Sequence, residues 1–293
     1  MAVVVLAGVL AYGYLSMDLL GLVSSLDKRH MVGRASAPPA KAPIQDPGTY
    51  NMNPSPKDIS NAKFTSVVLD ATTKHTATVI FLHGFGDSGA GWAPVGEQFS
   101  RYLPHVKFVF PNAPPLAITA HGGTLTPAWF DLYTPEIAYK MVFDEKRMLL
   151  SRQKVMDIIN EEIEQNKIPA DRIVIGGFSQ GCVLGLLIGL TSEQKLAGII
   201  GLSGHIPLPE KIMDLATEAN RKTPIFYGHG DSDLVVKYEH GKQSVQLLKD
   251  NKYNVQFQTY PHLDHSANDQ ELRDILAFLL EVIPKVTPGM AKM

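Results

Sequence analysis

The amino-acid sequence predicts an α/β protein with a mainly parallel central sheet that is flanked by helices. Two observations lead to this prediction. From about residue 62, short apolar runs alternate with helical patterns, and several of these runs end in glycine-rich or polar turns. Strands that alternate with helices form crossover units, which place the strands parallel in one sheet. Ligands bind such sheets beyond the carboxyl ends of the strands, so function is expected at those turns.

Seven segments are typical of strands. The first alternates apolar and polar residues, as an edge strand does, and the next two are more continuously apolar. In chain order the predicted strands are 63–70, 76–82, 105–111, 172–177, 196–204, 223–230 and 254–260.

Helical patterns separate most of these strands. One helix is predicted to begin after the glycine-rich turn that ends near residue 92. Four more are predicted at 145–167, 181–190, 238–250 and 268–283. The helix at 181–190 is apolar on most sides, so we expect it to be well buried. The apolar residues of 145–167 that can share one helical face are Met148, Leu149, Val155, Ile158, Ile159 and Ile163.

The chain of 293 residues divides into three predicted parts. Residues 1–32 form an apolar leader, and residues 33–61 form a proline-rich linker of the kind that is extended rather than packed. Residues 62–293 form the α/β domain. We find no internal repeat and no heptad array.

The apolar part of the leader, up to residue 26, has no charge before Asp18 and is followed by a basic cluster at 28–34. As a membrane anchor through residues 2–26, it would leave the domain cytoplasmic, because basic flanks stay on the cytoplasmic side. A second interpretation is a signal peptide, which would make the domain a secreted one. The leader lacks the basic start that is typical of signal peptides. A third interpretation places the true first residue at Met31 or Met52.

Composition excludes some classes of function. Hydrophobic residues make up 45% of the chain and charged residues 19%, which is enough for a sizeable core. The formal net charge of −2 gives none of the basic excess that is typical of nucleic-acid-binding proteins. Cys182 is the only cysteine, so no intrachain disulfide can form, which fits a reducing compartment.

The stretch Gly177-Phe178-Ser179-Gln180-Gly181 matches the pattern G-x-S-x-G. In a nucleophile elbow of this pattern, the serine sits on a strained turn between a strand and a helix, and only small residues fit two positions to either side. The predicted strand before the serine and the predicted helix after it supply that context. We interpret Ser179 as a nucleophile, and the alternative is a plain strand–turn–helix connection.

A serine nucleophile needs a base, and the base needs an orienting acid. In folds with this elbow, the acid and then the histidine follow the serine in the chain. The turn after strand 223–230 offers Asp231 and Asp233, and the turn after the last strand offers His262 and His265. By position, either member of each pair fits, and the other aspartate would be a turn residue.

Three further histidines follow the serine and fit less well. His205 precedes the acid, His229 lies in the acid turn itself, and His240 lies within a predicted helix. A histidine in such a place is more often a surface or core residue than a catalyst.

An oxyanion hole is usually made by two backbone N–H groups. One belongs to the residue after the nucleophile, Gln180, and the other to the loop after an early strand. The sequence His-Gly-Phe-Gly from residue 83 opens a glycine-rich loop at that place, with Phe85 as the donor. We expect His83 and Asp87 to position this loop. A phosphate site is not expected, because the P-loop lysine and the dinucleotide fingerprint are absent.

Several motifs, taken together, resemble the acyl-protein thioesterase/lysophospholipase family, a branch of the α/β-hydrolases that is related to bacterial carboxylesterases. The motifs are FLHGFGDSGAGW, PNAPP, PAWFDLY, GGFSQGC, QKLAGIIGLSGHIPL, HGDSDLVV and DHSA, and the resemblance covers about residues 62–283. It implies a serine hydrolase of the α/β-hydrolase fold with one catalytic domain, no cofactor and no metal.

The resemblance also assigns roles. It implies Ser179 as the nucleophile and the second residue of each pair, Asp233 and His265, as the acid and the base. It implies the backbone N–H groups of Phe85 and Gln180 as the oxyanion donors. The implied substrates are S-acylated proteins, lysophospholipids and small acyl esters.

The sequence departs from the family pattern at two places. Cys182 stands where a second glycine is usual, and DLVV stands where DPLV is common. Neither change touches the implied triad, and we expect Cys182 to pack as a small buried hydrophobe.

The segment 115–133 is long, apolar and aromatic, and we expect it to be irregular. Long irregular insertions are often lids or binding loops. The side chains predicted to line an acyl channel are Leu116, Ile118, Leu125, Trp129 and Phe130. Trp129 and Phe130 are alternatively core anchors. The alternative function is that of a general carboxylesterase for short acyl esters, and a non-catalytic binding protein is disfavoured because all three triad residues are present.

Overall fold

The computed structural model describes residues 64–138 and 141–286 of the chain. The predicted leader at 1–32 and the linker at 33–61 lie outside the described residues, so their roles stay predictions. Among the described residues, no helix has both the length and the apolar character that crossing a membrane requires.

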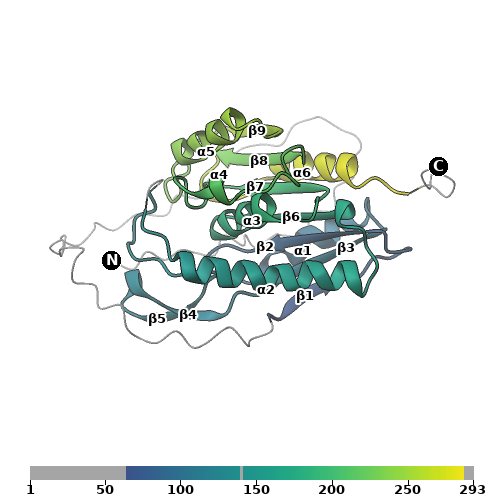
Figure 1. Ribbon diagram of the computed structural model, residues 1–293, viewed down its shortest axis with the longest axis horizontal. Helices are drawn as coiled ribbons and strands as arrows, with labels where there is room; N and C mark the ends of the chain where they lie inside the picture. The colour runs from purple at the N-terminus through teal and green to yellow at the C-terminus, as the bar shows by residue number, and fades with distance from the viewer. Residues whose placement is uncertain (1–63, 139–140, 287–293) are drawn as a thin grey trace, which may run out of the picture. The chain divides into compact units, whose positions relative to one another are not determined.

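Within the described residues, seven strands form one sheet (Figure 1). The edge strand at 66–69 is antiparallel to its neighbour, and the other strands are parallel to one another. The sequence predicted the edge position of that strand and a mainly parallel sheet, but not its antiparallel direction. The strands in spatial order are β1 (Ser66–Leu69), β3 (Val106–Pro111), β2 (Ala77–Leu82), β6 (Ile173–Phe178), β7 (Gly198–Leu202), β8 (Ile225–Gly230) and β9 (Val255–Tyr260).

Helices cover both faces of this sheet. One face packs against α2 (Glu145–Glu164), α3 (Gln180–Thr191) and α5 (Tyr238–Asp250), and the other face packs against α1 (Gly89–Ser100) and α6 (Asp269–Val282). Successive strand residues point to opposite faces. Ile80 and Leu82 of β2 therefore join the first core, while Val79 and Phe81 join the second.

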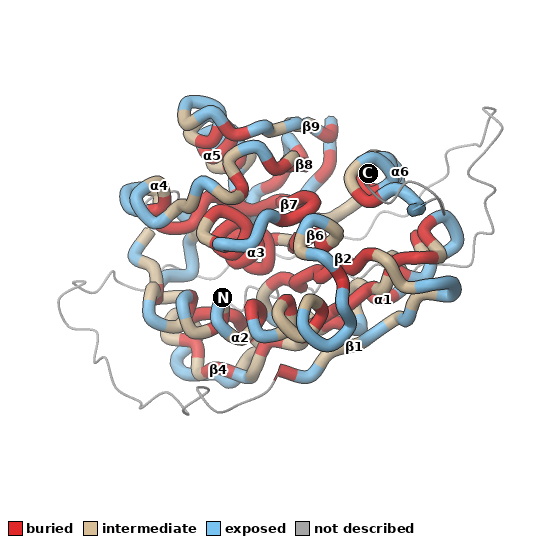
Figure 2. Tube along the Cα trace, turned by 45° about the vertical axis from the view of Figure 1, so that its right-hand side comes forward, coloured by how far each residue is buried: buried red, intermediate tan, exposed pale blue. Residues whose placement is uncertain are grey.

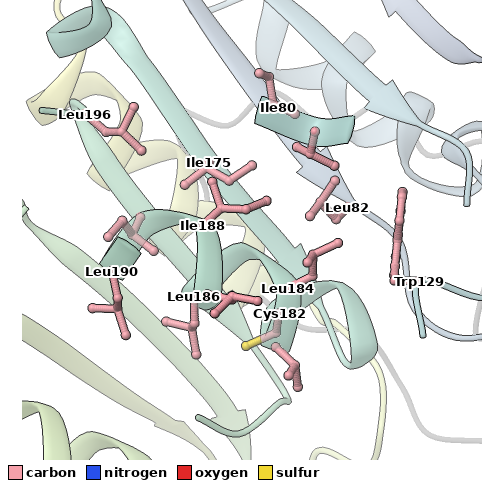
Figure 3. Packing of buried hydrophobic residues seen from close by; sticks show 14 of the residues in the cluster. Ile80, Leu82, Trp129, Ile175, Cys182, Leu184, Leu186, Ile188, Leu190 and Leu196 are labelled. Carbon is pink, nitrogen blue, oxygen red and sulfur yellow. The ribbon is translucent and has the colours of Figure 1, made fainter. Parts of the chain in front are cut away.

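Helix α3 lies against the middle of the sheet. Figure 2 shows that this helix is buried along nearly its whole length. Its sequence is apolar all round, so its other sides pack against the neighbouring helices, as predicted. Figure 3 places Leu184 and Ile188 of this helix among Ile80, Leu82 and Ile175 of the strands, with Trp129 beside them.

The sequence prediction was wrong about the segment 115–133, which is not irregular. It contains an antiparallel pair of strands, β4 (Pro115–Ile118) and β5 (Thr124–Pro127). The turn between them needs glycine, because Gly122 and Gly123 have φ values of 62° and 84°. The turn end of β4 is fixed by Asp131, whose carboxylate accepts hydrogen bonds from the backbone and side chain of Thr119.

Two smaller differences also appear. Leu149 does not share the buried face of α2 but is 43% exposed, because it points away from the stripe that contains Met148, Val155 and Ile159. A short helix, α4 (Ile212–Leu215), was not predicted, since four residues show no helical period.

The topology determines where a site can form. After β2, the chain adds β3 on one side of that strand, and it later adds β6 on the other side. The carboxyl ends of β2 and β6 therefore meet at the position where the strand order reverses, which is where ligands bind such sheets.

Candidate active site

Ser179 occupies the turn between β6 and α3. Its φ and ψ of 54° and −118° are rarely adopted by residues with a side chain, so the turn is strained. A Cβ atom on Gly177 would overlap the backbone of Gly181, and one on Gly181 would overlap the carbonyl oxygen of Leu82. The sharp turn therefore requires both glycines, as the pattern G-x-S-x-G predicted.

Three predicted residues from three turns meet at this point. The hydroxyl of Ser179 and Nε2 of His265 are 2.9 Å apart, and Nδ1 of His265 lies 2.7 Å from Oδ2 of Asp233. An ionised carboxylate only accepts hydrogen bonds, so Nδ1 carries the proton and Nε2 presents its lone pair to the serine. This arrangement can draw the proton from the hydroxyl.

Asp233 is held on both carboxylate oxygens. Oδ1 accepts hydrogen bonds from the backbone N–H groups of Val235 and Val236, each at 2.9 Å. Burial by itself would raise the pKa of this carboxyl, but interactions with His229 and His265 outweigh burial and lower the pKa to about 2. Asp233 is therefore ionised at neutral pH.

The competing members of the two pairs have structural roles. Asp231 is exposed, and its Oδ1 accepts a hydrogen bond from the backbone N–H of His262 at 2.7 Å. His262 is also exposed and has a φ of 60°. These two residues join the acid turn to the histidine turn, and among the described residues neither forms a hydrogen bond with Ser179.

The predicted oxyanion donors lie at the ends of two paired strands. Phe85 is in the turn after β2, Gln180 is the first residue of α3, and Leu82 pairs with Gly177 in the sheet. No backbone acceptor is recorded for either N–H among the described residues. The first N–H groups of a helix lack intrahelical acceptors, so that of Gln180 is available for an oxyanion.

His83 positions the loop that carries Phe85. Its Nε2 accepts a hydrogen bond from the backbone N–H of Ala113 at 3.0 Å, so its proton is on Nδ1, which donates to the carbonyl of Gly84 at 2.7 Å. Burial lowers the pKa of His83, which keeps this ring neutral. The indole N–H of Trp129 donates to the carbonyl of His83 at 2.8 Å.

The side chain of Gln180 has a role that sequence reasoning missed. Its Oε1 accepts from the backbone N–H of Trp129 at 2.8 Å, and its Nε2 donates to the carbonyl of Phe130 at 2.9 Å. Ser151 of α2 donates to the carbonyl of Trp129 at 2.5 Å. Only the backbone N–H of Gln180 was predicted to matter, because no local pattern links a residue at 180 to the segment near 130.

Four of the five predicted channel residues are buried: Leu116, Ile118, Trp129 and Phe130. Trp129 and Phe130 belong to the main core, which agrees with the alternative interpretation as core anchors. Leu116 and Ile118 form a small cluster with Ala128 under the hairpin, against which Phe85 packs. Of the five predicted channel residues, only Leu125 is exposed, at 62%, and so open to a ligand.

Cys182 is completely buried in the first turn of α3. Its Sγ lies where a Cβ on Gly204 would have to fit, and Gly201 lies close to it as well. Burial raises the pKa of its thiol to about 12. The residue therefore packs as a small hydrophobe, as expected, and carries no chemistry.

The doubly covered parallel sheet, the serine elbow and the histidine and acid from later turns define an α/β-hydrolase of the serine hydrolase class. Residues 64–283 match the family model described as Phospholipase/Carboxylesterase. The chain belongs to this family.

Named relatives match this chain over nearly their whole length. The acyl-protein thioesterase 1 of Neurospora crassa is 47% identical over 234 residues, which cover 78% of this chain and 95% of the relative. The acyl-protein thioesterase 1 of Mycosarcoma maydis is 43% identical over 224 residues, which cover 72% of this chain and 93% of the relative. The crystal structure of acyl-protein thioesterase 2 of Zea mays superposes with a TM-score of 0.67 at 28% identity, covering 75% of this chain and 99% of that one.

Proposed function

We propose that this protein is an acyl-protein thioesterase that hydrolyses the fatty-acyl thioesters of S-acylated proteins. The observation that carries the proposal is the hydrogen-bonded line from Ser179 through His265 to Asp233. It lies in a chain that is 47% identical to a relative named for this activity. In the proposal, these three residues are the catalytic triad.

The first half of the reaction acylates the serine. Oγ of Ser179 attacks the thioester carbonyl carbon while its proton moves to Nε2 of His265. The new C–O bond makes a tetrahedral intermediate, which collapses when the C–S bond breaks. The departing cysteine sulfur leaves as a thiolate or takes the proton from His265, and the acyl group stays on Ser179.

Two N–H groups stabilise the charge that develops in this step. The backbone N–H groups of Phe85, in the turn after β2, and of Gln180, next to Ser179, have no backbone acceptor among the described residues. A fixed donor aimed at the oxyanion is worth about 10²–10³ in kcat. The hydrogen bonds of Trp129 to His83 and to Gln180 hold both donor segments in place before substrate arrives.

Water completes the cycle. His265 removes a proton from water, which attacks the acyl carbonyl, and then returns the proton to Ser179 as the fatty acid leaves. Asp233 stabilises the imidazolium in both halves, and its ionised state at neutral pH suits that role.

The same residues would also hydrolyse an oxyester, such as a lysophospholipid or a short acyl ester. An alkoxide leaves less readily than a thiolate, so an oxyester depends more on proton donation by His265. The family description names both phospholipases and carboxylesterases, which makes a carboxylesterase the second candidate.

A rate comparison on purified protein tests the proposal. A palmitoyl-thioester peptide, lysophosphatidylcholine and short-chain nitrophenyl esters are supplied separately, with Ser179→Ala as the control variant. We expect the highest kcat/KM on the thioester peptide and no turnover by the variant. Highest kcat/KM on short esters would favour the carboxylesterase. Failure of the wild-type protein to react with a fluorophosphonate probe would overturn both.

A further inference from the structure

We propose that His229 is a positioning residue for the reaction, which holds the turn around the carboxylate of Asp233. The proposal rests on the proposed function of the triad. His229 is on β8, four residues before the acid, and it is fully buried. Sequence reasoning placed it in the acid turn itself and set it aside, whereas it belongs to the strand before that turn.

The acceptor beside the His229 ring shows which ring nitrogen donates. Nε2 lies 2.8 Å from the carbonyl oxygen of Val236, which only accepts, so Nε2 carries the proton and donates it. Nδ1 then faces α5 with no hydrogen-bond partner among the described residues. A Cβ on Gly241 would overlap Nδ1, so this glycine makes room for the ring.

The hydrogen bond from His229 to the carbonyl of Val236 helps to hold the acid turn. The backbone N–H groups of Val235 and Val236 both donate to Oδ1 of Asp233, while the carbonyl of Val236 accepts from His229. The peptide units around Val236 are therefore held from two directions. This leaves Oδ2 of Asp233 directed at Nδ1 of His265.

The same N–H of His229 also lies 3.4 Å from Oδ2 of Asp233. Asp233 is only 3% exposed, so water does little to stabilise its negative charge. The positive end of a buried N–H at this distance favours the ionised carboxylate, and the charge is what makes Asp233 useful to His265.

Other titratable groups approach His229 from the elements around it. His205 follows β7, Asp233 follows β8, and Tyr238 and His240 come from α5, near Lys237. On β9 its paired residue is Thr259, which does not titrate. Burial lowers the pKa of both neighbouring histidines, that of His205 to about 4, so each gains charge only at a lower pH than an ordinary histidine does.

Two variants of nearly equal polarity test the role. In His229→Gln, the amide nitrogen reaches the place of Nε2 and can still donate to Val236. In His229→Asn, the shorter side chain cannot. Both bury a neutral amide, so a difference between them reports the donor rather than burial. His229→Phe is the apolar control, and thermal melting shows which variants are folded.

The readouts are kcat, KM and the dependence of kcat/KM on pH with a nitrophenyl ester. We expect His229→Asn to lose about 10- to 100-fold in kcat with little change in KM, as a displaced catalytic group does. Its acidic limb, which reports protonation of the base, should move to lower pH because the support from Asp233 is weaker. His229→Gln should restore most of kcat and the wild-type limb.

Other outcomes overturn the proposal. Equal kcat and identical pH profiles for the two amide variants would make His229 an ordinary core residue, as would a loss of thermal stability alone. Should both amide variants unfold, the low-field proton resonance between His265 and Asp233 is measured in Gly241→Ala, which presses on the His229 ring: an unmoved resonance overturns the proposal, and a shifted or lost one supports it. Failure of the proposed function is distinguishable, because it would remove the activity of the wild-type protein itself.

Discussion

The side-chain carbonyl of Gln180 accepts a hydrogen bond from the backbone N–H of Trp129 at 2.8 Å. This bond joins the residue after Ser179 to the segment that follows β5. Through the indole of Trp129, the same segment is bonded to the carbonyl of His83, near the other predicted oxyanion donor. The two donor loops therefore share one anchor.

Replacing that anchor should damage both loops. In Gln180→Leu, the Trp129 N–H and the Phe130 carbonyl lose their buried partner, and an unsatisfied buried polar group costs about 1–3 kcal/mol. We expect a lower melting temperature and a reduced kcat, because the backbone N–H at 180 is no longer held in place. Calorimetry and ester turnover measure the two effects. The control Gln165→Leu, at an exposed position, should change neither; wild-type values for Gln180→Leu would contradict the anchor role.

The strands, most helices and the place of the site could be predicted because each follows from a local pattern. The elbow, the acid turn and the histidine turn each follow a strand, so their chain order indicated the site. The choice of Asp233 and His265 within each pair came from family resemblance, since both members of each pair lie at the same strand end.

The supporting contacts could not be predicted in this way. The bond between Gln180 and Trp129 joins residues 51 positions apart, and His229 acts through a backbone carbonyl. Neither contact leaves a period or a motif in the sequence. The β4–β5 hairpin was missed for a different reason: its turn signal, Gly122-Gly123, was present, but the strands on either side are only four residues each.

The choice of acid can be tested by a matched pair of substitutions. In Asp233→Asn, the charge that stabilises the imidazolium is lost. The amide oxygen stays with the N–H groups of Val235 and Val236, so the amide NH2 faces Nδ1 of His265, donates to it and selects the wrong tautomer. We expect a fall in kcat of about 10⁴, the size seen for this change in other triads. Asp231→Asn removes an exposed charge, while its amide oxygen can still accept from the His262 N–H, and it should keep most of the activity. Comparable losses in the two variants would show that the acid had been assigned wrongly.

The need for glycine at the elbow can be tested by comparing alanine substitutions at two glycines of α3. Gly181→Ala places a Cβ atom on the carbonyl oxygen of Leu82, which is backbone and cannot move aside. We expect it to lose fluorophosphonate labelling of Ser179 and to melt at lower temperature. Gly185→Ala, one turn further along α3, meets the backbone of Gly176 at 3.3 Å and is a tighter but tolerable fit. If Gly181→Ala labels as fast as the wild type, the turn does not depend on this glycine.

Glu271 should make the protein less stable as the pH rises. This residue of α6 is fully buried, and neither carboxyl oxygen has a hydrogen-bond partner among the described residues. Burial, and then the charge of Asp274, raise its pKa to about 8. The unfolded chain releases this proton near its ordinary pKa of about 4.3, whereas the folded chain keeps it. Between these two values the folded state binds more protons, so stability falls with pH by at most about 1.4 kcal/mol per unit.

The variant Glu271→Gln removes that dependence while it keeps the size of the side chain. Its melting temperature should exceed that of the wild type at pH 7.5, by about 2–4 °C for each kcal/mol gained, and the difference should shrink toward pH 5. Glu281→Gln, an exposed position on the same helix, is the matched control and should leave the curve unchanged. A constant difference between wild type and Glu271→Gln from pH 5 to 7.5 would mean that Glu271 is ionised in the folded protein, so that its burial does not hold the proton.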